Sequence, residues 1–197
     1  MYDNKGNEVD KICPFCRAPA SESGKEDTKR LNKRMKVDDP IAIYTVGCCY
    51  QNGLRDFPRD MAKALELWHR AAELGNAAAY NNIGTAYYYG EGAEIDKKKA
   101  QQYYELAAMA GDVCARHNLG NKEDIARNTD RSLKHHMIAV RGGYDQSLEK
   151  IRRLYTEGYA TKEDYTEALR SYQAYLGEIK SPQRDKAAAH SDKFRYY

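Results

Sequence analysis

Two cysteines near the N-terminus have a spacing that both metal sites and redox sites use. Cys13 and Cys16 enclose the dipeptide Pro-Phe, in the order Cys-x-x-Cys. A structural zinc ion takes four cysteine or histidine ligands, so this pair supplies half of one site. The first histidine in the chain is His69. Zinc at Cys13 and Cys16 therefore needs ligands from another chain or from a longer form of this one. The alternatives are a turn that no longer binds metal and a redox pair, although no strand-helix-strand pattern follows to support redox chemistry.

Other reactive side chains form no recognisable catalytic arrangement. His135 and His136 are adjacent, but the residue four positions after His135 is Ala139, so no second ligand follows at helical spacing. The chain contains no phosphate-binding Gly-rich loop, no His-Glu-x-x-His motif and no serine or cysteine in a known nucleophile setting. The sequence therefore predicts no catalytic residues and no independent enzyme.

Composition indicates a folded protein of a reducing compartment. The chain has 197 residues, of which 42% are apolar and 31% charged. No stretch approaches the roughly 20 apolar residues of a membrane span, and the N-terminus lacks an apolar leader. Five cysteines, two of them adjacent, do not suit a disulfide framework. A net charge of +3 is too small to indicate nucleic-acid binding. We expect a cytoplasmic or nuclear location and no contact with membranes.

An internal repeat organises most of the chain. The segment 63–75 recurs at 99–111 and 131–143, and more weakly at 167–179. The first aligned position is small: Ala64, Ala100, Ser132 and Ala168, at steps of 36, 32 and 36 residues. The second is aromatic or histidine: Trp68, Tyr104, His136 and Tyr172. The third is alanine in three copies: Ala71, Ala107 and Ala139. Such a step indicates a helical-repeat solenoid, in which each unit buries its apolar face against a neighbour. His136 then packs between helices and does not bind metal.

Each unit is predicted to be a pair of helices joined by a loop. Three first helices carry a glycine at the same register, Gly47, Gly84 and Gly120, which indicates that another helix approaches too closely for a side chain. Candidate N-caps stand four residues before each aligned small residue: Asp60, Asp96, Asn128 and Asp164. Three second helices end at glycines suited to a left-handed turn: Gly75, Gly111 and Gly143. In the third unit the predicted loop, 121–128, is short and lacks the Gly-x-Gly of residues 90–92.

The register of these residues resembles the Sel-1-like repeats of the tetratricopeptide superfamily. The likeness covers roughly 39–179 and is best at 77–111. It implies an all-α fold, an α/α superhelical solenoid of about four helix-turn-helix repeats. It further implies a non-catalytic adaptor that holds other proteins or peptides on its concave face. We divide the chain into a segment at 1–24, a basic capping helix at 25–37, the solenoid at 38–180 and a tail at 181–197. The basic face of the capping helix is interpreted as solvated, with an acidic partner or nucleic acid as the alternative.

If the geometry follows the tetratricopeptide pattern, first-helix residues that face away from the core line the groove. These are Tyr44, Cys48, Gln51, Asn81, Thr85, Tyr88, His117, Asn121, Glu149 and Arg153. Asparagine can bind a ligand backbone, tyrosine adds apolar area, and arginine pairs with carboxylates. The alternative is that they are ordinary surface residues.

A second resemblance concerns residues 13–17, Cys-Pro-Phe-Cys-Arg, which are similar to the last ligand pair of a RING finger. A complete RING finger, the zinc domain of many ubiquitin ligases, needs eight ligands in two sites. This resemblance implies an alternative function: a RING-type ubiquitin-ligase-related protein in which the repeats select the substrate.

Overall fold

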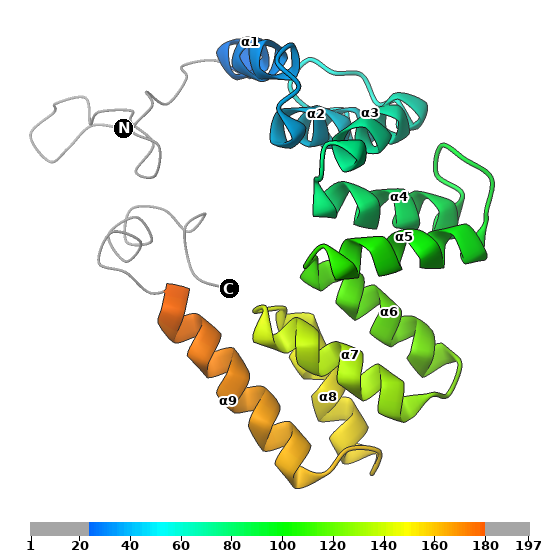
Figure 1. The fold of residues 1–197 in the computed structure, drawn as a ribbon, viewed down its shortest axis with the longest axis vertical. Helices are drawn as coiled ribbons and strands as arrows, with labels where there is room; N and C mark the ends of the chain where they lie inside the picture. Colours follow the sequence, from blue (N-terminus) through cyan, green and yellow to red (C-terminus); the bar gives the residue numbers. More distant parts are fainter. Residues whose placement is uncertain (1–23, 180–197) are drawn as a thin grey trace, which may run out of the picture.

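The computed structural model describes residues 24–179, which form α-helices joined by short loops. The predicted segment at 1–24 with Cys13 and Cys16 and the tail at 181–197 lie outside the described residues, apart from Gly24. The helices are α1 (Gly24–Met35), α2 (Pro40–Asn52), α3 (Met61–Glu73), α4 (Ala77–Tyr89), α5 (Lys97–Met109), α6 (Val113–Ile125), α7 (Thr129–Arg141), α8 (Asp145–Thr156) and α9 (Lys162–Ile179). The described part contains no strand, and the predicted all-α solenoid is confirmed (Figure 1).

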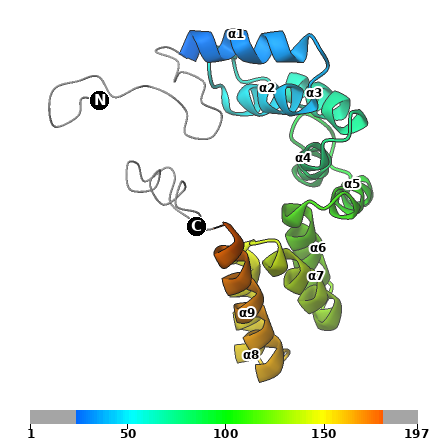
Figure 2. The same cartoon turned by 60° about the vertical axis from the view of Figure 1, so that its left-hand side comes forward.

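The helices pack as consecutive antiparallel pairs. α2 lies with α3, α4 with α5, α6 with α7 and α8 with α9, and each pair also contacts the next. Figure 2 shows the array as an arc with α1 at one end and α9 at the other. α1 contacts α2, because Leu31 is buried with Ala42 and Val46. The open end of the first pair is thereby covered, as a terminal element of a solenoid must do.

Small and aromatic residues recur in the core as the alignment predicted. Trp68, Tyr104 and His136 are all buried. Each ring lies against the glycine of its partner helix: a Cβ on Gly47 would lie 2.6 Å from Trp68 Nε1, and one on Gly120 would lie 2.7 Å from His136 Cε1. The predicted close approach is confirmed, and so is packing of His136 between helices.

The aligned alanines are also buried. Ala64, Ala100, Ser132 and Ala168 are fully enclosed, and so are Ala71, Ala107 and Ala139. Small side chains at these positions let neighbouring helices pack closely against one another.

Helix ends follow the predicted signals in most units. Asp60 accepts a hydrogen bond from Lys63 N at 3.0 Å, and Asp96 accepts one from Lys99 N at 2.9 Å. Gly75, Gly111 and Gly143 have φ values of 88°, 90° and 86°, the left-handed conformation that reverses the chain.

Two predicted caps are corrected. Asp164 lies inside α9, because Thr161 precedes the helix and accepts a hydrogen bond from Asp164 N at 3.1 Å. The Asp164 carboxylate returns the contact by accepting from Thr161 N at 2.9 Å, a reciprocal capping box. Asn128 occupies the N-cap position of α7 without a capping hydrogen bond, since its amide donates to Glu123 Oε2 at 2.7 Å.

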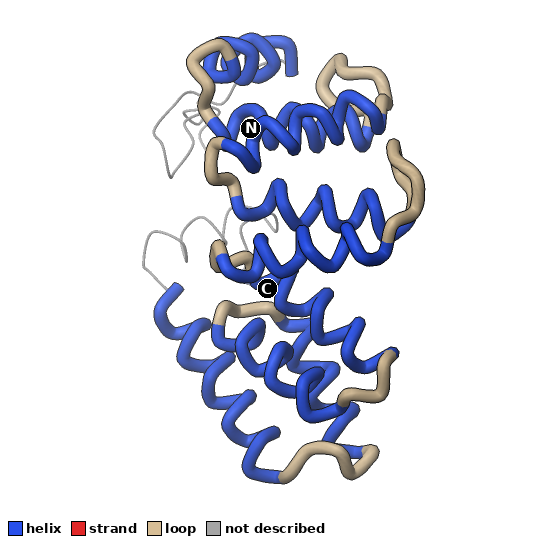
Figure 3. The backbone as a smooth tube through the Cα atoms, turned by 45° about the vertical axis from the view of Figure 1, so that its right-hand side comes forward, coloured by secondary structure: helices blue, strands red, loops and turns tan. Residues whose placement is uncertain are grey.

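The predicted loop at 121–128 is also corrected. α6 continues to Ile125, and Arg127 takes a left-handed conformation with φ of 61°. The loop consists of 126–128, whereas the equivalent loop between α4 and α5 runs from 90 to 96. Figure 3 shows the longer loop extending back toward the preceding pair and the shorter one as a tight connection.

Candidate functional site

A cavity of about 540 Å³ lies where α4, α5 and α6 meet, at the ends that adjoin their hairpin loops. It is lined by Thr85, Tyr88 and Tyr89 of α4, Lys97, Gln101 and Tyr104 of α5, and Asn118, Asn121, Lys122, Ile125 and Ala126 at the end of α6. Its size falls within the range of roughly 300–1,000 Å³ typical of ligand pockets. Because the lining residues come from helices held by the core, the cavity is largely preformed.

Two large apolar side chains of its lining are exposed. Tyr89 is 65% exposed and Ile125 is 74% exposed. The rings of Tyr88 and Tyr89 meet edge to face, with centroids 4.9 Å apart. Exposed apolar groups gathered around one hollow, with polar groups at the rim, are typical of an interaction site.

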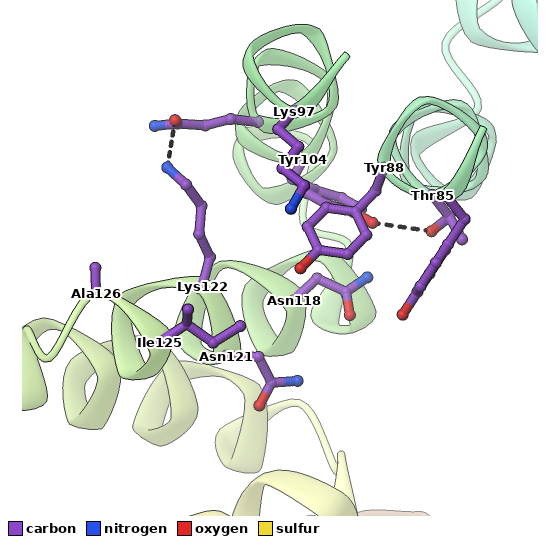
Figure 4. Close-up of a pocket in the computed structure, with 11 residues that line it drawn as sticks. Thr85, Tyr88, Lys97, Tyr104, Asn118, Asn121, Lys122, Ile125 and Ala126 are labelled. Carbon is purple, nitrogen blue, oxygen red and sulfur yellow. Dashed lines mark hydrogen bonds between the residues drawn. The ribbon is translucent and has the colours of Figure 1, made fainter. Parts of the chain in front are cut away.

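Polar contacts hold the lining in place (Figure 4). Thr85 Oγ1 lies 3.2 Å from Tyr104 Oη, so the hydroxyl groups link α4 to α5. Lys122 Nζ donates to Gln101 Oε1 and links α6 to α5. Next to the cavity, Asn118 Nδ2 donates to Asn81 Oδ1 at 2.9 Å and joins α6 to α4. These links fix the relative positions of the three helices.

The charge at the cavity is positive. Lys97 and Lys122 line it, and the lining contains no aspartate or glutamate. Lys97 Nζ lies 5.4 Å from the centroid of the Tyr88 ring, within range of a cation–π contact. The surface therefore combines aromatic area with two ammonium groups.

The short loop of the third unit explains why the cavity is open. In the preceding interface, Gly92 of the longer loop packs on the first residue of α3: a Cβ there would lie 2.7 Å from Met61 O. Lys97 is the first residue of α5 and so is equivalent to Met61. The loop at 126–128 is four residues shorter than the loop at 90–96, and Figure 3 shows it as a tight connection. We attribute the opening beside Lys97 to this deletion.

The structure brings together some of the predicted groove residues. Thr85, Tyr88 and Asn121 line the cavity, and Asn81 lies beside it in the contact with Asn118. Tyr44 lies between α2 and α4, where Asn82 Nδ2 donates to its hydroxyl at 3.4 Å. Burial raises the pKa of Tyr44, so this hydroxyl stays protonated. Whether these residues contact a partner stays a prediction.

The prediction that His117 is an open groove residue is wrong. Its side chain is 6% exposed, and its Nδ1 lies 2.8 Å from Ser147 Oγ. His136 Nδ1 lies 3.2 Å from the same hydroxyl. Burial lowers the pKa of His117 to about 4 and that of His136 to about 3, so both imidazoles are neutral at pH 7. His117 has become a core residue because α8 packs its Ser147 against the ring.

Arg153, another predicted groove residue, lies on α8 together with the predicted Glu149. Its Nε donates to Glu157 Oε1 at 2.7 Å, and this contact raises the pKa of Arg153. Arg153 lines a second cavity together with Glu149, Lys150 and Arg152, and His117 contributes to the same hollow. The predicted groove residues are therefore divided between separate hollows.

Sequence reasoning missed the contribution of α5. Lys97, Gln101 and Tyr104 stand at helical spacing on one face, a signal that was present in the sequence. α5 contacts α6 as the second helix of one pair beside the first helix of the next, a neighbour that the groove prediction from first helices alone did not include.

Among residues 24–179, no group of three or more histidine, cysteine, aspartate or glutamate side chains is placed to hold a metal ion. In the same range, no helix combines the length and apolar character needed to cross a bilayer.

Comparison with known proteins identifies the repeat. The model of the Sel1 repeat family matches residues 40–76 and 77–112. The crystal structure of a Sel1 repeat protein from Oxalobacter formigenes superposes with a TM-score of 0.68 at 28% identity, over 82% of this chain and 66% of that one. The fold also resembles c5321, an antigen of uropathogenic Escherichia coli, with a TM-score of 0.64 at 21% identity, over 86% of this chain and 36% of that one.

Among curated proteins, the chain is similar to "ERAD-associated E3 ubiquitin-protein ligase component HRD3B" of Arabidopsis thaliana, at 36% identity over 98 residues. The match covers 48% of this chain but 15% of that relative. The described part of the chain is thus a helical solenoid that contains two Sel1 repeats, at residues 40–76 and 77–112.

Proposed function

We propose that this chain is a non-catalytic scaffold that holds a partner polypeptide along its first helices, with the cavity between α4, α5 and α6 as the main point of attachment. The observation that carries the proposal is the group of exposed apolar residues around a preformed hollow, above all Tyr89 and Ile125. The Sel1 repeats at 40–76 and 77–112 support it, because this repeat implies a protein-binding solenoid.

The physical basis is preorganisation. The cavity walls belong to three helices linked by the contacts of Thr85 with Tyr104 and of Asn118 with Asn81. A surface that is already ordered loses little conformational entropy on association. A larger part of the interaction energy with the partner therefore remains as binding free energy.

Site-specific photocross-linking tests the proposal. The full chain is produced in cells of its source with a benzophenone amino acid at position 88, and in a second version at position 159. Tyr88 is half-buried in the lining of the cavity, whereas Tyr159 is an exposed tyrosine on the loop after α8, outside the cavity. We expect a discrete polypeptide adduct from position 88 that is absent from position 159. The same adducts from both positions, or none from position 88, would refute attachment at this surface.

A second candidate function is that of a ubiquitin-ligase component. Two observations favour it: the similarity to a protein named as an E3 ligase component, and the Cys13-x-x-Cys16 pair that resembles the end of a RING finger. In that role the repeats choose the substrate, and zinc at Cys13 and Cys16 requires further ligands from a partner chain or a longer form.

Metal analysis separates the two candidates. About one or two zinc ions per chain, together with self-ubiquitination in a reconstituted assay, would favour the ligase. Purified protein without zinc and without such activity would leave the scaffold as the function.

A further inference from the structure

We propose that the cavity between α4, α5 and α6 receives an aromatic side chain of the partner that is flanked by aspartate or glutamate. This inference rests on the proposed scaffold function and specifies the chemistry of its partner. It follows from the juxtaposition of tyrosine rings and ammonium groups around one hollow.

The interior and mouth of the cavity select an aromatic group. Tyr88 and Tyr89 meet edge to face, and Tyr104 forms part of the wall between them and α6. Aromatic rings pack favourably against other rings at edge and offset angles. Ile125 and Ala126, at the α6 end of the cavity, add aliphatic side chains to the lining (Figure 4). An inserted ring would therefore contact rings on one side and aliphatic carbons on the other.

The rim selects negative charge next to that ring. Lys97 and Lys122 come from different helices on two sides of the hollow, and no lining residue is acidic. The carboxylates of α6 are engaged elsewhere: Glu123 accepts a hydrogen bond from Asn128, and Asp124 lies 4.0 Å from Lys150. These two carboxylates of α6 therefore point to other partners than Lys122, and with no acidic residue in the lining the two ammonium groups attract carboxylates of a partner.

Gln101 holds one of these cations in position. Its Nε2 donates to Glu105 Oε1 at 2.7 Å, which orients the amide so that its Oε1 accepts from Lys122. The Lys122 ammonium retains other N–H donors, because a primary ammonium carries three. A carboxylate can thus bind without breaking the link between α5 and α6.

The experiment uses three short peptides with blocked ends and a fluorescein label, read by fluorescence anisotropy against the full chain. The first contains Asp-Phe-Asp between glycine-serine flanks. The second replaces phenylalanine by alanine, and the third replaces both aspartates by lysine. We expect the first peptide to bind, the second to bind at least tenfold more weakly and the third to show no saturable binding. Equal affinity of the first two peptides, or no binding of the first, would overturn the proposal.

Variants locate the site. Ala126→Trp fills the cavity, whereas Ala110→Trp is matched because Ala110 is the C-cap of α5 and Ala126 the C-cap of α6, with nearly the same backbone angles. Lys97→Glu with Lys122→Glu reverses the charge at the rim. Lys98→Glu with Lys162→Glu changes the net charge equally at exposed positions outside the cavity. We expect tenfold or greater loss in the cavity variants and less than twofold change in their controls.

Peptide binding and the adduct from position 88 together distinguish failure of this inference from failure of the scaffold proposal. If Ala126→Trp abolishes peptide binding and also the adduct from position 88, both proposals stand. If the unaltered chain gives the adduct from position 88 but binds none of the peptides, the scaffold stands and the assigned partner chemistry is wrong. Equal loss in Ala110→Trp and Ala126→Trp would overturn the location of the site.

Discussion

Gly84 of α4 lies directly against the ring of Tyr104 of α5: a Cβ on Gly84 would be 2.8 Å from Tyr104 Cδ1 and 3.1 Å from the carbonyl oxygen of Ala100. The same arrangement joins Gly47 to Trp68 and Gly120 to His136. Because the glycine of the first helix has no side chain, the ring on the second helix can occupy the space between the two helices of each pair.

This contact predicts a large difference between two glycine substitutions. Gly84→Ala should lower the free energy of unfolding by about 1–3 kcal/mol, since the added methyl group overpacks the ring and the backbone behind it. Gly177 also lies in a helix but has nothing within 4 Å of an added Cβ, so Gly177→Ala should raise stability by about 0.5–1 kcal/mol. Urea unfolding of both variants measures the effect. A neutral Gly84→Ala would show that the helices do not approach as closely as described.

The buried histidines predict a stability that falls in mild acid. Burial depresses the pKa of His117 to about 4 and of His136 to about 3, while an unfolded chain binds these protons near pH 6.5. Lys150 lies close enough to depress both values further, while Asp145 opposes this at His117. The folded state binds these protons only at a lower pH than the unfolded state does. The contribution of the neutral histidines to the free energy of unfolding is therefore complete above about pH 6.5 and is lost as the pH falls toward 4.

Each histidine should contribute a slope approaching about 1.4 kcal/mol per pH unit within that window. Urea unfolding of wild type and of His136→Phe at pH 7, 6 and 5 measures the contribution of His136 to the pH dependence of stability. The carboxylates titrate alike in both proteins, so their contribution cancels in the difference. Parallel stability curves for the two proteins would contradict the depressed pKa of His136.

His136 also predicts a stabilising substitution. In the second repeat, Tyr104 Oη reaches Thr85 Oγ1 at 3.2 Å. The position equivalent to Thr85 is Asn121, whose Oδ1 is buried without a hydrogen-bond partner among the described residues. His136 Nε2 is unpaired in the same way. His136→Tyr should direct its hydroxyl toward Asn121 and raise the free energy of unfolding by about 1 kcal/mol relative to His136→Phe.

Thermal unfolding of the two variants at pH 7 measures this difference. Repeating the comparison with Asn121→Ala should remove the advantage of tyrosine over phenylalanine. An advantage that survives removal of the amide would assign it to packing and not to the hydrogen bond.

Much of the scaffold could be predicted because its determinants recur. The glycine of the first helix, the aspartate caps and the terminal glycines each appear in register, so a single alignment located Gly84, Asp96 and Gly111 correctly. Of the two caps that were corrected, the one at Asp164 failed because Thr161 caps the helix three residues earlier.

The site was predicted only in part, because it depends on what differs between repeats. Thr85, Tyr88 and Asn121 followed from the first-helix pattern, but Lys97 and Gln101 belong to a second helix that faces α6. The prediction for His117 failed because an alignment shows which positions are equivalent between repeats, but not how closely α8 packs against α6.

Restoring the missing loop tests the central claim most directly. Residues 126–128 are replaced by the seven residues 90–96, Gly-Glu-Gly-Ala-Glu-Ile-Asp, and a control chain receives four glycine-serine residues in the loop before α9. Binding of the Asp-Phe-Asp peptide is then measured by anisotropy, after circular dichroism shows helix content equal to wild type. We predict at least tenfold weaker binding with the restored loop and wild-type binding in the control. Undiminished affinity in the restored chain would contradict the claim that the short third-repeat loop opens the binding cavity.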